Sequence, residues 1–238
     1  MGLRMAHSKA TRKKNRLPLR ISVIAIDGPA AAGKTAVGRA LARTLGFGYL
    51  DTGIMYRAIT WLALRSGISV DDTSSLGEIA RANPLKFVAN DDTKVTVAGL
   101  TLGPELREPS VDSNVSAVSK ASAVRRELVA QQQSVASKGK IIVIGRDIGT
   151  VVLPNADLKI YLTSSPAVRA QRRWQEMRDR GETVQLEAVL EETLTRDEID
   201  SNRENSPLRP AEDAWELNTD NLDIEQVVQE ILVRAGTL

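Results

Sequence analysis

One eight-residue segment of the sequence has the residue types and spacing that hold a phosphate group. The segment Gly28-Pro-Ala-Ala-Ala-Gly33-Lys34-Thr35 fits the pattern Gly, four residues, Gly-Lys-Thr. Its glycines let the backbone curl so that the amides point at phosphate oxygens. The Lys34 side chain would reach the β and γ phosphates of a nucleotide, and the Thr35 hydroxyl would ligate Mg²⁺. The segment therefore predicts nucleotide binding.

The phosphate-binding pattern leaves the reaction open, because kinases, GTPases, transport ATPases and motors share it. A GTPase would need an Asn/Thr-Lys-x-Asp segment to bind the guanine base, and the nearest candidate, Thr93-Lys-Val-Thr96, lacks the aspartate. The Ser-Gly-Gly signature of a transport ATPase is absent from the sequence. A motor usually has a carboxylate directly after an apolar strand, whereas here Gly145 and Arg146 separate Ile144 from Asp147. A kinase fits best.

Arginine and hydroxyl side chains stand where a second anionic substrate would bind. An expected strand ends at Leu50 and leads into Asp51-Thr52-Gly53-Ile-Met-Tyr56-Arg57, in which Thr52 would cap the following helix. Arg57 would lie about one turn further along that helix. A hydroxyl, helix-start amides and a guanidinium would then meet at one phosphate-sized volume. Taken alone, the segment also suits a capped helix with a surface arginine.

Two further groups of charged residues recur at helical spacing. The first group comprises Arg196, Asp200 and Arg203. Spacings of four and seven residues would put all three on one face of a helix. The second would share one face of a helix over 165–180, and it comprises Arg169, Arg172 and Arg173. Taken alone, each group is equally typical of a solvated helix surface.

The composition is that of an ordinary globular protein and excludes several kinds of chemistry. The 238 residues are 42% hydrophobic and 26% charged. Without cysteine there is no disulfide framework, zinc–thiolate site or thiol nucleophile, and one histidine, His7, is too few for a His-rich metal site. Aromatic residues, at 3%, are too few for a surface that stacks single-stranded nucleic acid. Since no apolar run approaches the length of a spanning helix, we expect a soluble protein. We further expect it to be cytoplasmic and monomeric.

Basic charge is concentrated at the N-terminus. Residues 1–20 hold seven Lys and Arg residues and no Asp or Glu, so the remaining chain has 25 basic and 30 acidic residues. We expect 1–20 to be a solvated, disordered tail. The sequence leaves open whether this tail binds RNA or a membrane surface. It also leaves open whether the tail is a transit peptide and whether translation starts at Met5.

The rest of the chain alternates strand and helix patterns. Apolar runs typical of buried strands lie at 21–26, 141–144 and 158–162, with weaker runs at 48–50 and 214–217. One helical pattern begins after the first strand, a second at Ser165-Pro166 and a third at Asp223, with Gln226 three residues later. Gly46 and Gly181 are expected to end the first two of these helices. This order predicts an α/β fold with a five-stranded parallel sheet covered by helices on both faces.

One segment departs from that alternation. Residues 86–97 have the pattern of a hairpin around an Asn-Asp-Asp turn, and residues 101–104 add a third short strand. A small antiparallel sheet is therefore expected within residues 68–120, between the second and third strands of the main sheet.

Four motifs in order match the pattern of one family. They are Gly-Pro-x-x-x-Gly-Lys-Thr at 28, Leu-Asp-Thr-Gly-x-Met-Tyr-Arg at 50, Gly-Arg-Asp-Ile-Gly-Thr-Val-Val at 145 and Arg-Asp-x-x-Asp-x-x-Arg at 196. From about 21 to 236 the chain closely resembles the bacterial-type cytidylate kinases, in the nucleoside monophosphate kinase group of P-loop kinases. The resemblance implies a core made of 21–67, 121–164 and 182–238, an inserted monophosphate-binding domain at 68–120 and a helical lid at 165–181.

The activity that the resemblance implies is transfer of the γ-phosphoryl group of ATP to CMP or dCMP, with Mg²⁺ as cofactor. The implied catalytic residues are Lys34, Arg146, Arg172, Arg173 and Arg203. The implied ATP site comprises Gly28, Pro29, Ala30, Ala31, Ala32, Gly33, Lys34, Thr35, Ala36, Arg169 and Arg172. Mg²⁺ would rest on Thr35, the phosphates and waters, and Asp51 would orient one of these waters.

The implied CMP site has three parts. Its phosphate clamp comprises Thr52, Arg57, Arg146 and Arg203, its ribose site Arg196 and Asp200, and its base site Ser116, Arg125 and Asp147. Gly53 and Tyr56 are further implied CMP-binding residues. A carboxylate at Asp147 would accept a hydrogen bond from the cytosine N4 amino group and repel the O4 of uracil. The family more often has serine where Thr52 stands, and threonine keeps the hydroxyl.

Two other interpretations stay open. A related P-loop kinase would have another acceptor, such as UMP or a small alcohol, although no obvious carboxylate is present to deprotonate an alcohol. A nucleotide-gated binding module would use its basic tail on RNA, against which stand the arginine-rich acceptor site and the scarcity of aromatic residues. We expect neither a specific nucleic-acid partner nor a membrane.

Overall fold

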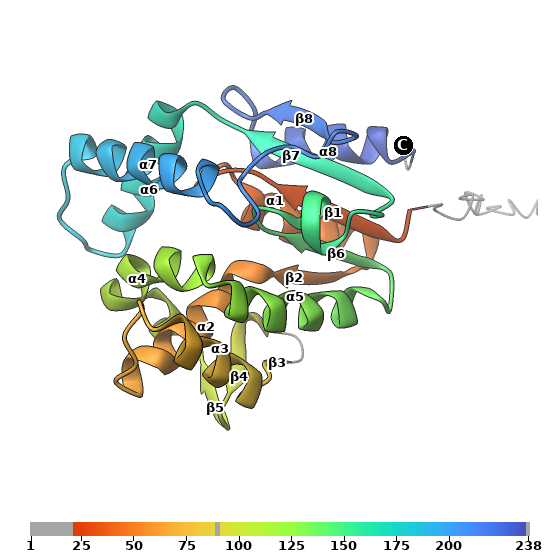
Figure 1. Ribbon diagram of the computed structural model, residues 1–238. Coiled ribbons are helices and arrows are strands. Elements are labelled where there is room, and N and C mark those ends of the chain that lie inside the picture. The colour runs from red at the N-terminus through yellow and green to blue at the C-terminus, as the bar shows by residue number, and fades with distance from the viewer. Residues whose placement is uncertain (1–20, 89–90, 237–238) are drawn as a thin grey trace, which may run out of the picture.

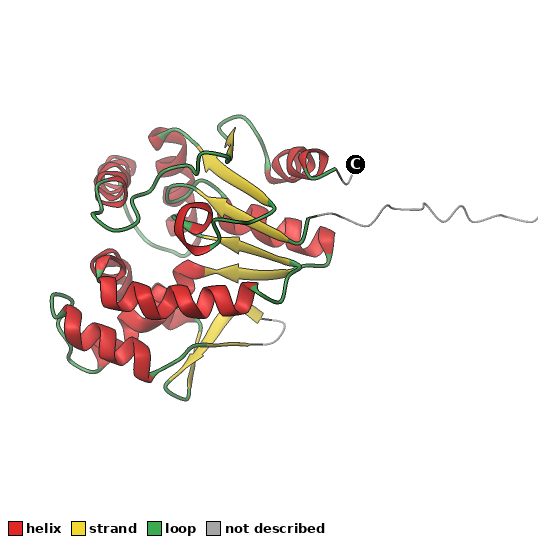
Figure 2. Cartoon of the chain, turned by 45° about the vertical axis from the view of Figure 1, so that its right-hand side comes forward, coloured by secondary structure: helices red, strands yellow, loops and turns green. Residues whose placement is uncertain are grey.

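The computed structural model describes residues 21–88 and 91–236, and at its centre is a five-stranded parallel sheet (Figure 2). Its strands are β1 (Val23–Asp27), β2 (Gly48–Asp51), β6 (Ile141–Ile144), β7 (Leu158–Thr163) and β8 (Trp215–Asn218). Their order is β2-β6-β1-β7-β8, with Val23 of β1 opposite Ile141 and Ile24 opposite Leu158. The predicted parallel sheet is confirmed, and β1 begins at Val23 rather than at Ile21.

Helices cover both faces of the sheet, because the central strands bury side chains on both sides (Figure 1). These helices are α1 (Lys34–Leu45), α2 (Thr52–Arg65), α5 (Ser122–Ala136) and α8 (Ile224–Arg234). Ile24 and Ile26 pack with α1 and α8, whereas Ala25 between them packs in the hydrophobic cluster that holds α2 and α5. As predicted, α1 ends at Gly46 in a left-handed conformation, and α8 begins with a capping box.

Between β2 and β6 the chain forms a second, smaller unit, which lies below the main sheet in Figure 1. After α2 its elements are α3 (Thr73–Ala82), β3 (Lys86–Val88), β4 (Asp91–Val97), β5 (Leu100–Leu102), the 3₁₀ helix η1 (Pro104–Arg107) and α4 (Pro109–Lys120). The three strands pair antiparallel in the order β3-β4-β5. The predicted hairpin and third strand are confirmed, although residues 89–90 of the turn lie outside the described residues.

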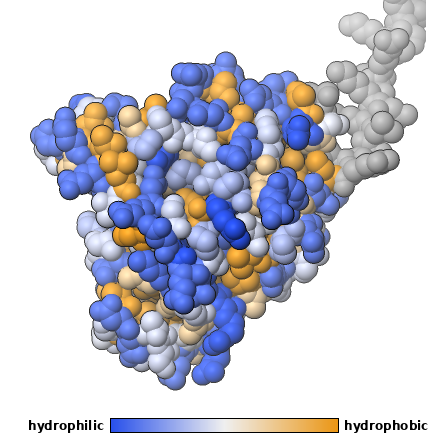
Figure 3. Space-filling model, turned by 45° about the horizontal axis from the view of Figure 1, so that its top comes forward, coloured by the Kyte–Doolittle hydropathy of each residue, from blue (hydrophilic) through white to orange (hydrophobic). Residues whose placement is uncertain are grey.

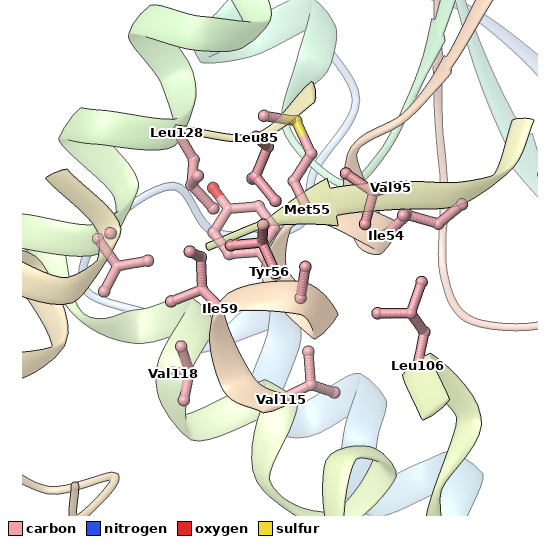
Figure 4. Packing of buried hydrophobic residues seen from close by; sticks show 14 of the residues in the cluster. Ile54, Met55, Tyr56, Ile59, Leu85, Val95, Leu106, Val115, Val118 and Leu128 are labelled. Atoms are coloured by element: carbon pink, nitrogen blue, oxygen red, sulfur yellow. The ribbon is translucent and has the colours of Figure 1, made fainter. Parts of the chain in front are cut away.

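A hydrophobic cluster joins this antiparallel unit to the main sheet. Figure 4 shows the Tyr56 ring of α2 among Met55, Ile59, Leu85 and Leu128. Burial raises the pKa of Tyr56 to about 12, so its hydroxyl stays protonated. One continuous hydrophobic core includes residues of α2, α4 and α5, so it does not mark where one domain ends and the next begins. The domain boundaries at 68 and 120 therefore stay a prediction.

Two helices, α6 (Pro166–Asp179) and α7 (Leu186–Ser201), lie beyond the carboxyl ends of the main strands (Figure 1). As predicted, Ser165 caps α6 by accepting a hydrogen bond from the N–H of Val168, and Gly181 follows its end with a φ of 82°. The prediction that Arg203 shares a helix face with Arg196 and Asp200 is wrong. α7 ends at Ser201, because the turn-forming residues 202–207 do not continue a helix.

The connection from β6 to β7 contains one π-helical turn, η2 (Ile148–Val152). No helix in the described part of the chain is long and apolar enough to cross a membrane. Figure 3 shows hydrophilic residues over much of one face, with hydrophobic residues scattered between them. The basic tail over 1–20, expected to be disordered, lies outside the described residues.

Candidate active site

A cavity of about 1220 Å³ opens at the carboxyl ends of the parallel strands, where open α/β sheets bind their ligands. Most of the residues implicated by the sequence line it: Ala30, Ala31, Ala32, Gly33, Lys34, Thr35, Ala36, Thr52, Gly53, Tyr56, Arg57, Ser116, Arg125, Arg146, Asp147, Arg172, Arg173, Arg196, Asp200 and Arg203. Gly28, Pro29 and Arg169 are not among the lining residues. One cavity therefore unites the two groups of residues implied for the donor and for the acceptor.

Two glycines shape the loop between β1 and α1. Gly28 has a φ of 145°, and a Cβ there would overlap the carbonyl oxygen of Leu162 in β7, so the loop approaches the sheet only without a side chain. Gly33 has a φ of 91° and precedes α1, whose start has no side-chain cap. The N–H groups at the start of α1 are therefore available to an anion.

The Lys34 ammonium is buried at this loop. It donates hydrogen bonds to the carbonyl oxygens of Gly28 and Pro29, at 2.7 and 2.6 Å. Burial, and after it the positive charge of Arg146, lowers the pKa of Lys34 well below its usual value. A phosphate in the loop would supply the negative charge that stabilises the buried ammonium.

A hydroxyl and a carboxylate lie next to each other at the cavity wall. Thr35 Oγ1 is 3.4 Å from Asp51 Oδ2. Both are oxygen ligands of the kind that Mg²⁺ takes while it keeps several waters. In residues 21–88 and 91–236, no group of three His, Cys, Asp or Glu side chains is placed to hold a metal ion. The residues present fit a Mg²⁺ ion held mainly by nucleotide phosphates and water.

Asp51, and not Thr52, caps α2, which corrects the sequence-based expectation. The Asp51 side chain accepts a hydrogen bond from the N–H of Gly53 at 2.9 Å, and Thr52 is the first helical residue. The Asp51 carboxylate occupies the capping position one residue earlier. The Thr52 hydroxyl instead donates to the carbonyl oxygen of Ile144 at 2.9 Å and ties the start of α2 to the end of β6.

Arginines from distant parts of the sequence gather around the carboxylate of Asp200. It accepts hydrogen bonds from Arg146 Nε, at 2.9 Å, and from Arg203. Burial, and after it the charge of Arg146, lowers the pKa of the neighbouring Arg196 to about 10. The Nε atoms of Arg196 and Arg203 are buried and have no hydrogen-bond partner within residues 21–88 and 91–236. One carboxylate cannot neutralise three guanidinium groups, so this cluster has unpaired donors and excess positive charge for an anion.

Arg125 and Asp147, both implied for the base site, form a buried ion pair. Arg125 also donates to Ser206 Oγ at 3.0 Å, and its guanidinium lies 5.8 Å from the centre of the Tyr56 ring. Arg125 contacts Oδ2 of Asp147. The other carboxylate oxygen of Asp147, Oδ1, has no hydrogen-bond partner within the described chain. Ser206 stands in no recognisable motif, and its φ of 56° belongs to the turn after α7.

Arg169 lies behind the phosphate-binding loop. Its guanidinium pairs with Asp197 of α7 at 2.5 Å and donates to the carbonyl oxygen of Ala30 at 3.3 Å. The side chain is almost completely buried. Arg169 therefore supports the loop from outside the cavity, and the structure separates it from the other two arginines of its helix.

Arg172 and Arg173 do face the cavity. Arg172 donates to the carbonyl oxygen of Thr219 at 2.6 Å, and Arg173 reaches Asp112 of α4 at 3.3 Å. Arg57 contacts the same Asp112 carboxylate at 2.5 Å. Asp112 has no sequence signal, because only the fold brings α4, α2 and α6 together.

Asp27, the last residue of β1, also supports the site, although it was not among the site residues predicted from the sequence. Its two carboxylate oxygens accept hydrogen bonds from the N–H groups of Ile148 and Gly149, each at 2.7 Å. Asp27 thereby fixes the turn that carries Arg146 and Asp147. A carboxylate directly after the apolar run at 21–26 is the signal that could have identified it.

Known proteins resemble this chain over most of its length. The cytidylate kinase family model matches residues 24–236. A cytidylate kinase of Bacillus licheniformis is 44% identical over 211 residues, covering 88% of this chain and 93% of that one. A cytidylate kinase of Streptococcus thermophilus is 45% identical over 214 residues, covering 89% and 95%. A solved structure of an uncharacterized protein from Eubacterium ventriosum shares the fold, with a TM-score of 0.51, 12% identity and coverage of 91% and 99%. The chain is a P-loop kinase that belongs to the cytidylate kinase family.

Proposed function

We propose that this enzyme transfers the γ-phosphoryl group of ATP to a phosphate oxygen of CMP or dCMP, giving ADP and CDP or dCDP. The observation that carries the proposal is the arginine cluster around Asp200, in which three guanidinium groups with a single carboxylate line the cavity that the phosphate-binding loop also lines. A nucleotide bound at the loop and a second phosphate bound at the arginines would face each other. The names of the relatives support cytidylate as the acceptor.

On the donor side, the loop amides and Lys34 would hold the phosphates of ATP. In this state the Lys34 ammonium exchanges its carbonyl partners for phosphate oxygens and stabilises charge on the transferred group. Bound Mg²⁺, held through Thr35, the phosphates and waters, would neutralise charge on the β and γ phosphates. Arg172 and Arg173 would add positive charge from α6.

On the acceptor side, Arg57, Arg146 and Arg203 would clamp the CMP phosphate. An oxygen of this phosphate attacks the γ phosphorus as the bond to the β–γ bridging oxygen breaks, and ADP leaves with the bonding electrons. The attacking oxygen is already ionised near neutral pH, so no general base is needed. Catalysis would rest on alignment and charge stabilisation. Arg196 and Asp200 are proposed to hold the ribose.

The base would be selected at Asp147. Its free Oδ1 can accept a hydrogen bond from the cytosine N4 amino group, while the ion pair with Arg125 holds the carboxylate in place. The O4 of uracil would meet the same carboxylate with a lone pair. A matched base edge is worth about 1–3 kcal/mol, or roughly tenfold to a hundredfold in selectivity. Ser116, at the cavity wall, is proposed as a further contact to the base.

Two segments would close over the substrates. We assign monophosphate binding to the insert at 68–120 and the lid to 165–181, on a core of 21–67, 121–164 and 182–238. Closure would exclude water, so that ATP passes its phosphoryl group to CMP rather than to water.

The proposal is tested by offering CMP, dCMP, UMP, AMP and GMP separately with ATP and Mg²⁺ and measuring diphosphate formation. Turnover largely confined to CMP and dCMP is the expected result. Turnover with UMP, AMP or GMP would keep the fold and the phosphate site but contradict the proposed acceptor. ATP binding without transfer to any acceptor would favour the binding module, whose RNA affinity should then be lost on deletion of residues 1–20.

A further inference from the structure

Asp112, in the first turn of α4, connects two parts of the molecule that the proposed function gives to different substrates. Its Oδ1 lies 2.5 Å from Nη1 of Arg57 in α2, and its Oδ2 lies 3.3 Å from Nη2 of Arg173 in α6. Arg57 belongs to the proposed acceptor clamp, and Arg173 belongs to the proposed lid. A single carboxylate of the insert therefore spans the acceptor wall and the lid.

The carboxylate holds these arginines from behind. Arg57 and Arg173 line the cavity, whereas Asp112 is not among its lining residues. Asp112 and the carbonyl oxygen of Leu106 both use Nη1 of Arg57, which leaves Nε and Nη2 without a partner among the described residues. One side of the guanidinium is thus anchored while its other donors remain free to bind a phosphate.

The charges at this point are unbalanced in favour of an anion. Arg107 also lines the cavity beside Arg57, so three guanidinium groups surround one carboxylate and leave two positive charges, which suits a phosphate dianion. Burial by itself would raise the pKa of Asp112, but Arg57, Arg173 and Arg107 together hold it below its usual value. Asp112 is therefore ionised at neutral pH.

We propose that Asp112 is a positioning residue that couples the acceptor site to the lid by holding Arg57 and Arg173 at the same time. The inference rests on the proposed function. Without the carboxylate, the two guanidinium groups would face each other without a counter-charge, and α6 would lose its attraction to α4. Binding of the acceptor would then no longer favour the lid position that binds the donor. Because such coupling is reciprocal, the affinity for one substrate reports on the other.

The experiment measures the Kd of CMP by calorimetry, with and without Mg²⁺ and a non-hydrolysable ATP analogue. It compares the natural enzyme with Asp112→Asn and with the control Asp91→Asn. The control removes a carboxylate of the same insert whose partners among the described residues are Lys94, at 2.9 Å, and the adjacent Thr93. We expect the analogue to tighten CMP binding about tenfold in the natural enzyme and in the control. In Asp112→Asn the tightening should be no more than about twofold.

A second variant guards against a folding defect. Asp112→Ser keeps a polar residue in the first turn of α4, and circular dichroism melting of each variant confirms that it is folded. Equal tightening in the natural enzyme and in the Asp112 variants overturns the proposal. So does a loss of CMP affinity by the same factor with and without the analogue, because Asp112 would then orient only Arg57. A natural enzyme that fails to bind CMP at all overturns the proposed function instead.

Discussion

Arg125 of α5 and Asp147, three residues after the end of β6, form an ion pair whose side chains are each only 6% exposed. The pair is held by Ser206 and by the aromatic ring of Tyr56 beside the guanidinium. Burying a carboxylate without a compensating partner is costly, and Arg125 provides that partner. The fold therefore places an oriented acceptor group, with one oxygen free, at the proposed base site.

Asp147→Asn should relax the preference for cytosine. An amide can turn its NH₂ group toward the O4 of uracil, so the ratio of kcat/KM for CMP over UMP should fall by roughly tenfold or more. Because Arg125 would lose its buried counter-charge, thermal melting should show a lower Tm as well. Asp213→Asn, which removes an exposed carboxylate paired with Lys159, is the control. Unchanged selectivity in Asp147→Asn would remove Asp147 from the base site.

Arg203→Ala should weaken capture of the acceptor. Arg203 pairs with Asp200 and lines the cavity, so its loss removes a positive charge and hydrogen-bond donors from the cluster. The KM for CMP should rise by roughly tenfold or more, while the KM for ATP changes much less. Steady-state kinetics with each substrate varied gives both values. A normal KM for CMP would mean that this cluster is not the acceptor clamp.

Lys34→Met should lower kcat by about a hundredfold or more, because it removes a charge from the transferred phosphoryl group. Among the described residues the buried ammonium makes two hydrogen bonds, both to carbonyl oxygens, and burial lowers its pKa well below the usual value, so its charge adds little to stability. The free energy of unfolding, measured in urea, should therefore change little. If kcat and stability fell together, Lys34 would have a structural role instead.

The buried Asp27 should make the free energy of unfolding depend on pH. Burial is the main cause that raises its pKa from 3.8 to about 6, against two backbone N–H groups that lower it. Between these values the native chain binds more protons than the unfolded chain. The contribution of Asp27 to the free energy of unfolding therefore falls as pH rises from about 4 to 6, by up to about 1.4 kcal/mol per pH unit. Above pH 6 the contribution stays constant.

Comparison with Asp27→Asn isolates this dependence. The amide loses one acceptor for the N–H groups of Ile148 and Gly149, which is a cost that does not vary with pH. Urea unfolding at several pH values should show that the stability of the natural enzyme relative to the variant declines between pH 4 and 6. Parallel pH profiles of the two proteins would mean that Asp27 titrates as it does in the unfolded chain.

Local patterns were sufficient to predict the strands, the phosphate-binding loop and several helix ends. A buried parallel strand such as β6 needs a continuous apolar run, and a loop such as Gly28 to Thr35 needs glycine at two positions, so both leave a mark in consecutive residues. The same holds for Ser165 before α6 and for Asp223 before α8, whose capping bonds join residues three apart. These features depend on neighbours in the chain.

Contacts between distant segments depended on the tertiary structure. Helical spacing grouped Arg169 with Arg172 and Arg173, but the packing of α7 buries Arg169 against Asp197 and leaves the other two at the cavity. The positions of Asp27 and Asp112 likewise follow from elements that meet only after folding. Hydrogen bonds and ion pairs have a range of a few ångströms, so which charged groups pair is decided by how helices and strands pack, and spacing along the chain does not encode it.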